Sequence, residues 1–115
     1  MKLLFVYNAN AGIAAGIMDS IHKTLSPATY PCDLCAITYG AVRMDPKWKA
    51  WLKGQPFESV FYHRPDFRAA YPDMTVDLPV ILIEQESRLE TLVAAIEFKN
   101  APSVDQLITL IEQRL

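Results

Sequence analysis

The chain has 115 residues, of which 51% are hydrophobic and 21% are charged, and these proportions are those of a single globular domain over residues 1–115. Its 11 basic and 13 acidic side chains give a formal net charge of -2, so it lacks the excess of positive charge that a dedicated nucleic-acid binder usually carries. No apolar run approaches the roughly 20 residues of a membrane-spanning helix, and we expect no membrane partner.

The beginning of the chain is predicted to be a strand rather than a secretory signal. Residues 3–7 form an uninterrupted apolar run, but a signal core needs roughly 7 to 15 apolar residues, and Asn8 and Asn10 interrupt this one at once. A strand covered on both faces of its sheet explains the run. We therefore expect a cytoplasmic protein with two reduced cysteines and no structural disulfide.

Two helices are expected in the first half. Apolar residues recur every four positions over residues 13–25, which predicts an amphipathic helix. Residues 26–43, which are rich in proline and other turn-forming residues, are predicted to be irregular. A second, short helix is then indicated by Asp45 as its N-cap, Pro46 as its first residue and Gly54 beyond its end.

The second half is predicted to be mostly strands. Residues 57–63 and 79–83 read as strands, the latter opened by a proline, and residues 65–72 allow a short helix between them. Residues 89–98 are a fourth strand candidate, although their alanines and leucines leave a helix open, and a last helix begins at Ser103. Early alternation implies a parallel crossover and a short polar turn implies a final hairpin, so we expect a four-stranded mixed sheet flanked by helices.

This order of elements resembles the thioredoxin fold. Leu78-Pro79 stands where that family has a cis-proline before its third core strand, and Cys32-Asp33-Leu34-Cys35 matches its CxxC motif. The resemblance implies an α/β thioredoxin-like sandwich over nearly the whole chain, similar to small uncharacterised bacterial proteins of this fold. In the family the CxxC directly follows the first strand, whereas Cys32 lies 25 positions after Tyr7. The first crossover is therefore expected to be enlarged and to carry the CxxC loop.

Cys32 and Cys35 are the strongest functional signal. The two-residue spacer lets both sulfurs approach bonding distance, and a helix N-terminus lowers the thiolate pKa of the first cysteine in such motifs. The resemblance implies dithiol–disulfide exchange without a cofactor, in which Cys32 attacks, Cys35 resolves, and the partner is another protein or a small thiol. Asp33, inside the motif, opposes thiolate formation through its negative charge.

Two other interpretations of the same cysteines remain open. Cys32 and Cys35 together with His22 and His63 form a ligand set that suits tetrahedral zinc, although the two histidines have no recognisable zinc-site spacing. Alternatively, the chain is a non-catalytic interaction protein with inert cysteines, in which aromatic residues around the cysteine loop, among them Trp48, dock on a partner.

A second candidate site, for a ligand, follows the second predicted strand. That strand should run parallel to the first, which places His63 and Arg64 beside the loop after Tyr7, at the edge of the sheet where α/β proteins often bind ligands. Arg64 could hold an anionic group and His63 could transfer a proton, while the resemblance adds Pro79. A surface ion pair of Arg64 with Asp66 that caps the next turn is the alternative.

Overall fold

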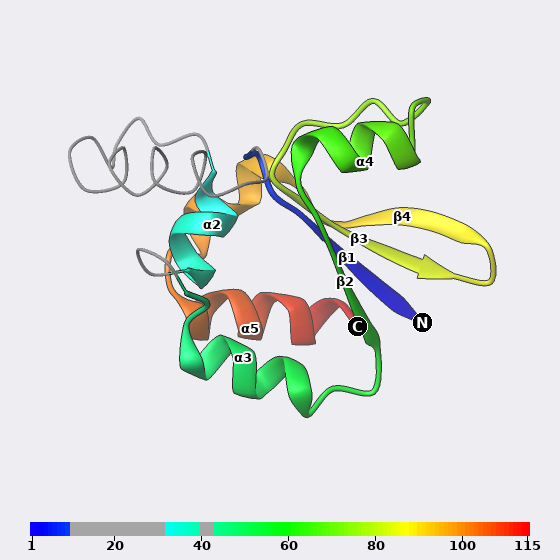
Figure 1. Ribbon diagram of the computed structural model, residues 1–115. Coiled ribbons are helices and arrows are strands. Elements are labelled where there is room, and N and C mark those ends of the chain that lie inside the picture. Colours follow the sequence, from blue (N-terminus) through cyan, green and yellow to red (C-terminus); the bar gives the residue numbers. More distant parts are fainter. Residues whose placement is uncertain (10–31, 40–42) are drawn as a thin grey trace.

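The computed structural model describes residues 1–9, 32–39 and 43–115 (Figure 1), so the helix predicted over residues 13–25 lies outside the described residues. The elements in chain order are β1 (Lys2–Val6), α2 (Asp33–Thr38), α3 (Pro46–Lys53), β2 (Glu58–Tyr62), α4 (Arg64–Ala70), β3 (Val80–Gln85), β4 (Arg88–Val93), the 3-10 helix η2 (Ala95–Asn100) and α5 (Val104–Arg114). No helix in the described part of the chain is long and apolar enough to cross a membrane.

The strands form one mixed sheet in the order β2-β1-β3-β4. The central strand β1 runs parallel to β2 and antiparallel to β3, and β3 and β4 form an antiparallel hairpin. Figure 1 shows α4 on one side of the sheet and α3 with α5 on the other. The predicted α/β class, four-stranded mixed sheet and flanking helices are confirmed.

Both faces of β1 are buried, as the apolar run at residues 3–7 predicts. The side chains of Leu3 and Phe5 enter a core that also contains Trp48 of α3 and Leu107 of α5. The side chains of Leu4 and Val6 point the other way, into a smaller core whose largest side chain is Phe67 of α4. Since successive residues of a strand alternate between faces, five consecutive apolar residues supply both layers.

The cap residues begin α3 and α5 where the sequence predicts. The Asp45 carboxylate accepts hydrogen bonds from the backbone N–H groups of Lys47 and Trp48, at 2.9 and 3.2 Å. The Ser103 hydroxyl oxygen accepts the backbone N–H of Gln106 at 3.2 Å. These bonds satisfy donors that the first turn of a helix would otherwise leave unpaired.

The prediction that residues 26–43 are irregular is wrong for residues 33–38, which form α2. Leu34 is buried completely, and the Thr38 hydroxyl donates to the Leu34 carbonyl at 2.7 Å. A helix of six residues makes fewer than two turns, too few for an apolar period to show in the sequence. Its N-cap is Cys32, which is not one of the residue types that usually mark a helix start.

The strand predicted over residues 89–98 is shorter, because β4 ends at Val93 and η2 follows. The carboxylate of Glu97 accepts the Ala94 backbone N–H at 2.9 Å and pairs with the guanidinium of Arg114 from α5. Arg114 also donates to the Leu92 carbonyl at 2.8 Å. The bonds of Glu97 and Arg114 thus stabilise the turn in which the chain leaves the sheet after β4.

The hairpin between β3 and β4 places two ordinary residues in the left-handed region. Glu86 and Ser87 have φ values of 50° and 66°, a conformation in which Asn and Gly are favoured. We expect the double substitution Glu86→Asn, Ser87→Gly to raise the free energy of unfolding by about 1 kcal/mol and the Tm by roughly 4 °C. Thermal unfolding followed by circular dichroism measures this. Thr91→Asn, within β4, is the control and should lower the Tm. A Tm of the double variant that falls by as much as that of the control would refute the prediction.

Candidate functional site

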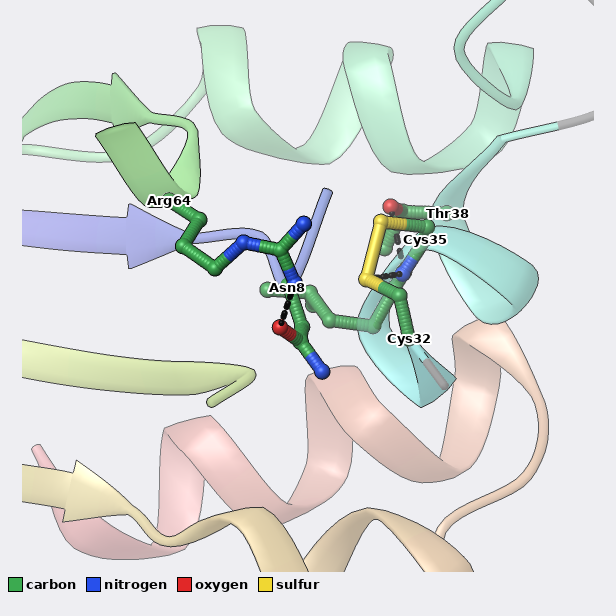
Figure 2. Close-up of a disulfide and its surroundings, with 6 residues drawn as sticks. Asn8, Cys32, Cys35, Thr38 and Arg64 are labelled. Atoms are coloured by element: carbon green, nitrogen blue, oxygen red, sulfur yellow. Dashed lines mark hydrogen bonds between the residues drawn. A yellow bond between two sulfur atoms is a disulfide. The ribbon is translucent and has the colours of Figure 1, made fainter. Parts of the chain in front are cut away.

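Cys32 and Cys35 are joined in a disulfide at the start of α2, with their Cα atoms 5.2 Å apart. The Cys32 Sγ accepts the backbone N–H of Cys35 at 3.2 Å (Figure 2), so the first sulfur serves as the N-cap of the helix. The bonded pair differs from the two reduced thiols expected for a cytoplasmic chain. It agrees with the prediction that a two-residue spacer brings both sulfurs to bonding distance.

Both cysteines lie within the main core. Cys32 is 0% exposed and Cys35 is 7% exposed. A redox pair of the expected kind would expose one sulfur, and full burial of both is what we expect of inert cysteines. The disulfide bond is what a redox-active CxxC forms, whereas the burial of both cysteines is typical of a structural pair. Measurements of chemical reactivity distinguish the two roles.

The negative charge of Asp33 has a partner that sequence reasoning missed. The Nζ of Lys99 lies 3.7 Å from the Oδ2 of Asp33, in a pair that joins α2 to η2. No sequence signal identifies this lysine, because the contact depends on the packing of two short helices that lie far apart in the sequence. Lys99 brings a positive charge to the CxxC motif, which has no basic residue beside it in the sequence.

Asn8 and Arg64 meet at the edge of the sheet where β1 and β2 end. The Arg64 Nη1 donates to the Asn8 Oδ1 at 3.0 Å, and the Arg64 backbone N–H donates to the Ala9 carbonyl at 2.9 Å. Figure 2 shows the Arg64 side chain extending past the end of β1 to Asn8, with the disulfide beyond them. The predicted proximity of Arg64 to the loop after β1 is thus confirmed. Asn8 was missed as a site residue, although a polar residue directly after a buried parallel strand is a usable signal.

His63 and Asp66 begin α4. The Asp66 carboxylate accepts the backbone N–H of His63 at 2.9 Å, so Asp66 caps this helix. The predicted ion pair between Asp66 and Arg64 is not shown, and the Arg64 guanidinium bonds Asn8. The half-buried ring of His63 packs against Tyr7, with the ring centroids 5.8 Å apart. The imidazole therefore lies on the face of the sheet that carries α2, beside the end of β1.

Pro79 is buried and directly precedes β3, and the Leu78–Pro79 peptide bond is cis, as the resemblance implies. Val80, the next residue, pairs with Val6 at the end of β1. The antiparallel register therefore brings Pro79 to the edge at which Asn8 emerges. The three residues predicted for ligand binding, His63, Arg64 and Pro79, flank this one strand end.

Zinc binding remains a prediction. Within residues 1–9, 32–39 and 43–115, no group of three or more His, Cys, Asp or Glu side chains is placed to hold a metal ion. His22 lies outside the described residues. The zinc ligand set that combines it with Cys32, Cys35 and His63 is therefore not tested by the geometry.

The interaction hypothesis loses one of its docking residues. Trp48 is completely buried, where its ring packs edge-on against Phe5 and stacks on Trp51 at centroid distances of 5.6 and 5.2 Å. This tryptophan belongs to the core and is not available to a partner.

Tyr7, directly after β1, packs against Tyr39 at the end of α2, and its burial makes the stability of the fold depend on alkaline pH. Burial raises the pKa of Tyr7 above its usual range, the neighbouring Tyr39 adds to the rise, and the Thr38 hydroxyl opposes part of it. The ring centroids of Tyr7 and Tyr39 are 5.7 Å apart. The neutral phenol is therefore the form that the folded state favours.

We expect the free energy of unfolding to fall above pH 10, because Tyr7 then ionises in the unfolded chain but not in the folded one. Its contribution is complete below the unfolded pKa of about 10 and is lost at up to about 1.4 kcal/mol per pH unit above it. Urea unfolding between pH 9 and 11.5 measures this slope, which Tyr7→Phe should reduce. Burial also raises the pKa of Tyr71, which is more exposed than Tyr7, so Tyr71→Phe is a graded comparison that should reduce the slope less than Tyr7→Phe does. Equal slopes for the Tyr7→Phe variant and the unmodified chain would contradict the prediction.

Comparisons of the chain with protein-family models, with curated proteins and with solved structures found no match.

Proposed function

We propose that the chain is a thioredoxin-like protein that exchanges electrons with disulfides through Cys32 and Cys35. The observation that carries the proposal is the disulfide between these residues at the start of α2, beside the carboxyl end of the central strand. The strand order β2-β1-β3-β4, with β2 parallel and β3 antiparallel to β1, supports the resemblance to the thioredoxin fold, as does Pro79 at the start of β3.

The reaction needs the protein in its dithiol form. The Cys32 thiolate attacks one sulfur of a partner disulfide, a mixed disulfide forms, and the other partner sulfur leaves as a thiolate. Cys35 then gives up its proton and attacks the Cys32 sulfur, which releases the second partner thiolate. The protein dithiol loses two electrons and the partner disulfide gains them. The hydrogen bond from the Cys35 backbone N–H supports Cys32 as the more stable thiolate.

The strand edge supplies groups for holding the partner. The guanidinium of Arg64, oriented by Asn8, lies in the surroundings of the disulfide and can bind an anionic group of a protein or small-thiol partner. His63 at the same edge can accept or donate a proton during exchange. We assign Arg64 to partner binding and His63 to proton transfer.

We further propose that the protein works in the cytoplasm. Disulfides in that compartment are usually transient and serve catalysis or redox sensing, because glutathione and thioredoxin systems keep thiols reduced. A buried CxxC disulfide that closes a loop of only a few residues also contributes little to constraining the unfolded chain compared with a long-loop disulfide. In a reducing compartment, both arguments favour a redox role over a structural one.

The test is equilibration in glutathione buffers of graded potential, followed by alkylation and mass spectrometry of the intact chain. We expect a single two-electron transition with a potential above about -300 mV, the region of redox-active rather than structural disulfides. The Cys32→Ser, Cys35→Ser double variant should show no transition. A disulfide that stays oxidised throughout would overturn the proposal, and one equivalent of zinc on the reduced protein would favour the metal interpretation instead.

A further inference from the structure

We propose that Lys99 is a positioning residue that sets the reactivity of Cys32 by neutralising Asp33. This inference rests on the proposed function, since it concerns the thiol that begins the exchange. It assigns a role to a residue far from the CxxC motif in sequence, and it identifies the ion pair between α2 and η2 as part of the redox site.

Asp33 satisfies one requirement of the site and opposes another. As the first residue of α2 it places a negative charge near the helix N-terminus, which stabilises the helix. The same charge directly follows Cys32 and opposes ionisation of its thiol. The Asp33 side chain is only 33% exposed, so water screens this charge incompletely.

Lys99 offsets the opposition of Asp33 to ionisation of Cys32 and leaves the stabilisation of the helix in place. Its Nζ lies 3.7 Å from the Asp33 carboxylate and its side chain is 71% exposed, so the pair adds little to folding stability. The positive charge nevertheless opposes the field that Asp33 exerts on the neighbouring sulfur. Among the described residues, Figure 2 also places Arg64 on the strand side of the disulfide. The charge at position 99 therefore controls how readily Cys32 ionises.

The matched control is a second loose ion pair at the other end of β1. The Nζ of Lys2 lies 4.0 Å from the Glu58 carboxylate, and both side chains are about half exposed or more. Lys2 begins the strand, whereas the disulfide lies near its end. Lys2→Met removes one positive charge from the chain, as Lys99→Met does, but does so far from Cys32.

The experiment follows alkylation of Cys32 by iodoacetamide in the fully reduced protein from pH 5.5 to 9.5. The thiolate forms a bond to the reagent carbon and iodide leaves; peptide mass spectrometry separates Cys32 from Cys35. We expect Lys99→Met to slow alkylation at pH 7 about threefold and to shift the profile to higher pH. Lys99→Arg should keep the original profile, and Lys2→Met should leave it unchanged.

Asp33→Asn identifies the route of the effect. In that background Lys99→Met should change the Cys32 rate by a small factor only, because the charge that Lys99 neutralises is gone. In the original background, 0.5 M salt should shrink the effect, since the pair is exposed. The glutathione equilibrium should move about threefold toward the disulfide in Lys99→Met, which is about 14 mV.

Two results would overturn the inference. One is a Lys99→Met profile identical to that of the unmodified protein, and the other is an effect of Lys99→Met that is undiminished with Asp33→Asn. Either can occur while the glutathione transition of the unmodified protein is intact, and the proposed function then stands. Absence of that transition removes the proposed function regardless of the alkylation profiles.

Discussion

Cys35→Ser is expected to trap the protein as a stable mixed disulfide with a partner, whereas Cys32→Ser should react with the same partner at least tenfold more slowly. Cys32 accepts the Cys35 backbone N–H and caps α2, so its thiolate is the better stabilised of the two. Without Cys35, no internal thiol can resolve the first adduct. Intact-mass spectrometry after mixing each reduced variant with oxidised glutathione measures the rate and the lifetime of the adduct.

The exposure of the two cysteines predicts the opposite order of reactivity. Cys35 is 7% exposed and Cys32 is 0% exposed, so accessibility alone would make Cys35 the attacking thiol. If Cys32→Ser reacts faster than Cys35→Ser, accessibility outweighs thiolate stabilisation and the assigned roles are reversed. If neither variant reacts unless denatured, the cysteines are structural. A control in 6 M urea, where both thiols are exposed, gives the rate each variant has without the fold.

The elements that could be predicted are those whose signals are local. Five consecutive apolar residues identify β1, and Asp45, Pro46 and Gly54 identify α3, because strand burial and helix capping act through neighbouring residues. The short helix α2 was missed, and strand and helix were both left open for residues 89–98, where η2 begins. Neither helix is long enough to show a period. Their ends are fixed by contacts, such as the bond between Arg114 and Glu97, that join distant parts of the chain.

The same division applies to the site. Cys32 and Cys35 could be found from their spacing, and the approach of Arg64 to the end of β1 followed from parallel strands. The pairing of Lys99 with Asp33 could not be predicted, because it depends on how two short helices that are distant in the sequence pack together. The burial of both cysteines could not be predicted either, since the sequence shows that a residue is apolar but not which residues cover it.

Phe67→Ala is expected to lower the free energy of unfolding by about 3 to 5 kcal/mol, a large part of the 5 to 15 kcal/mol typical of a domain. Phe67 is completely buried and is the largest side chain of the smaller core, where it packs between Tyr62 and Tyr71 at centroid distances of 5.9 and 5.5 Å. Alanine leaves a cavity that the surrounding sheet fills only in part. Urea unfolding of the oxidised protein measures the loss.

The matched control is Phe61→Ala, because Phe61 is 38% exposed on the edge strand, where it stacks against Phe5 and Tyr7. We expect it to cost about 1 kcal/mol. The comparison also bears on function, since α4 begins with Arg64 and Phe67 is the residue that anchors this helix to the sheet. Loosening the anchor should weaken the bond between Arg64 and Asn8, so Phe67→Ala should slow exchange with an anionic disulfide more than with a neutral one. Equal destabilisation by the two substitutions would show that the smaller core does not hold α4 in place.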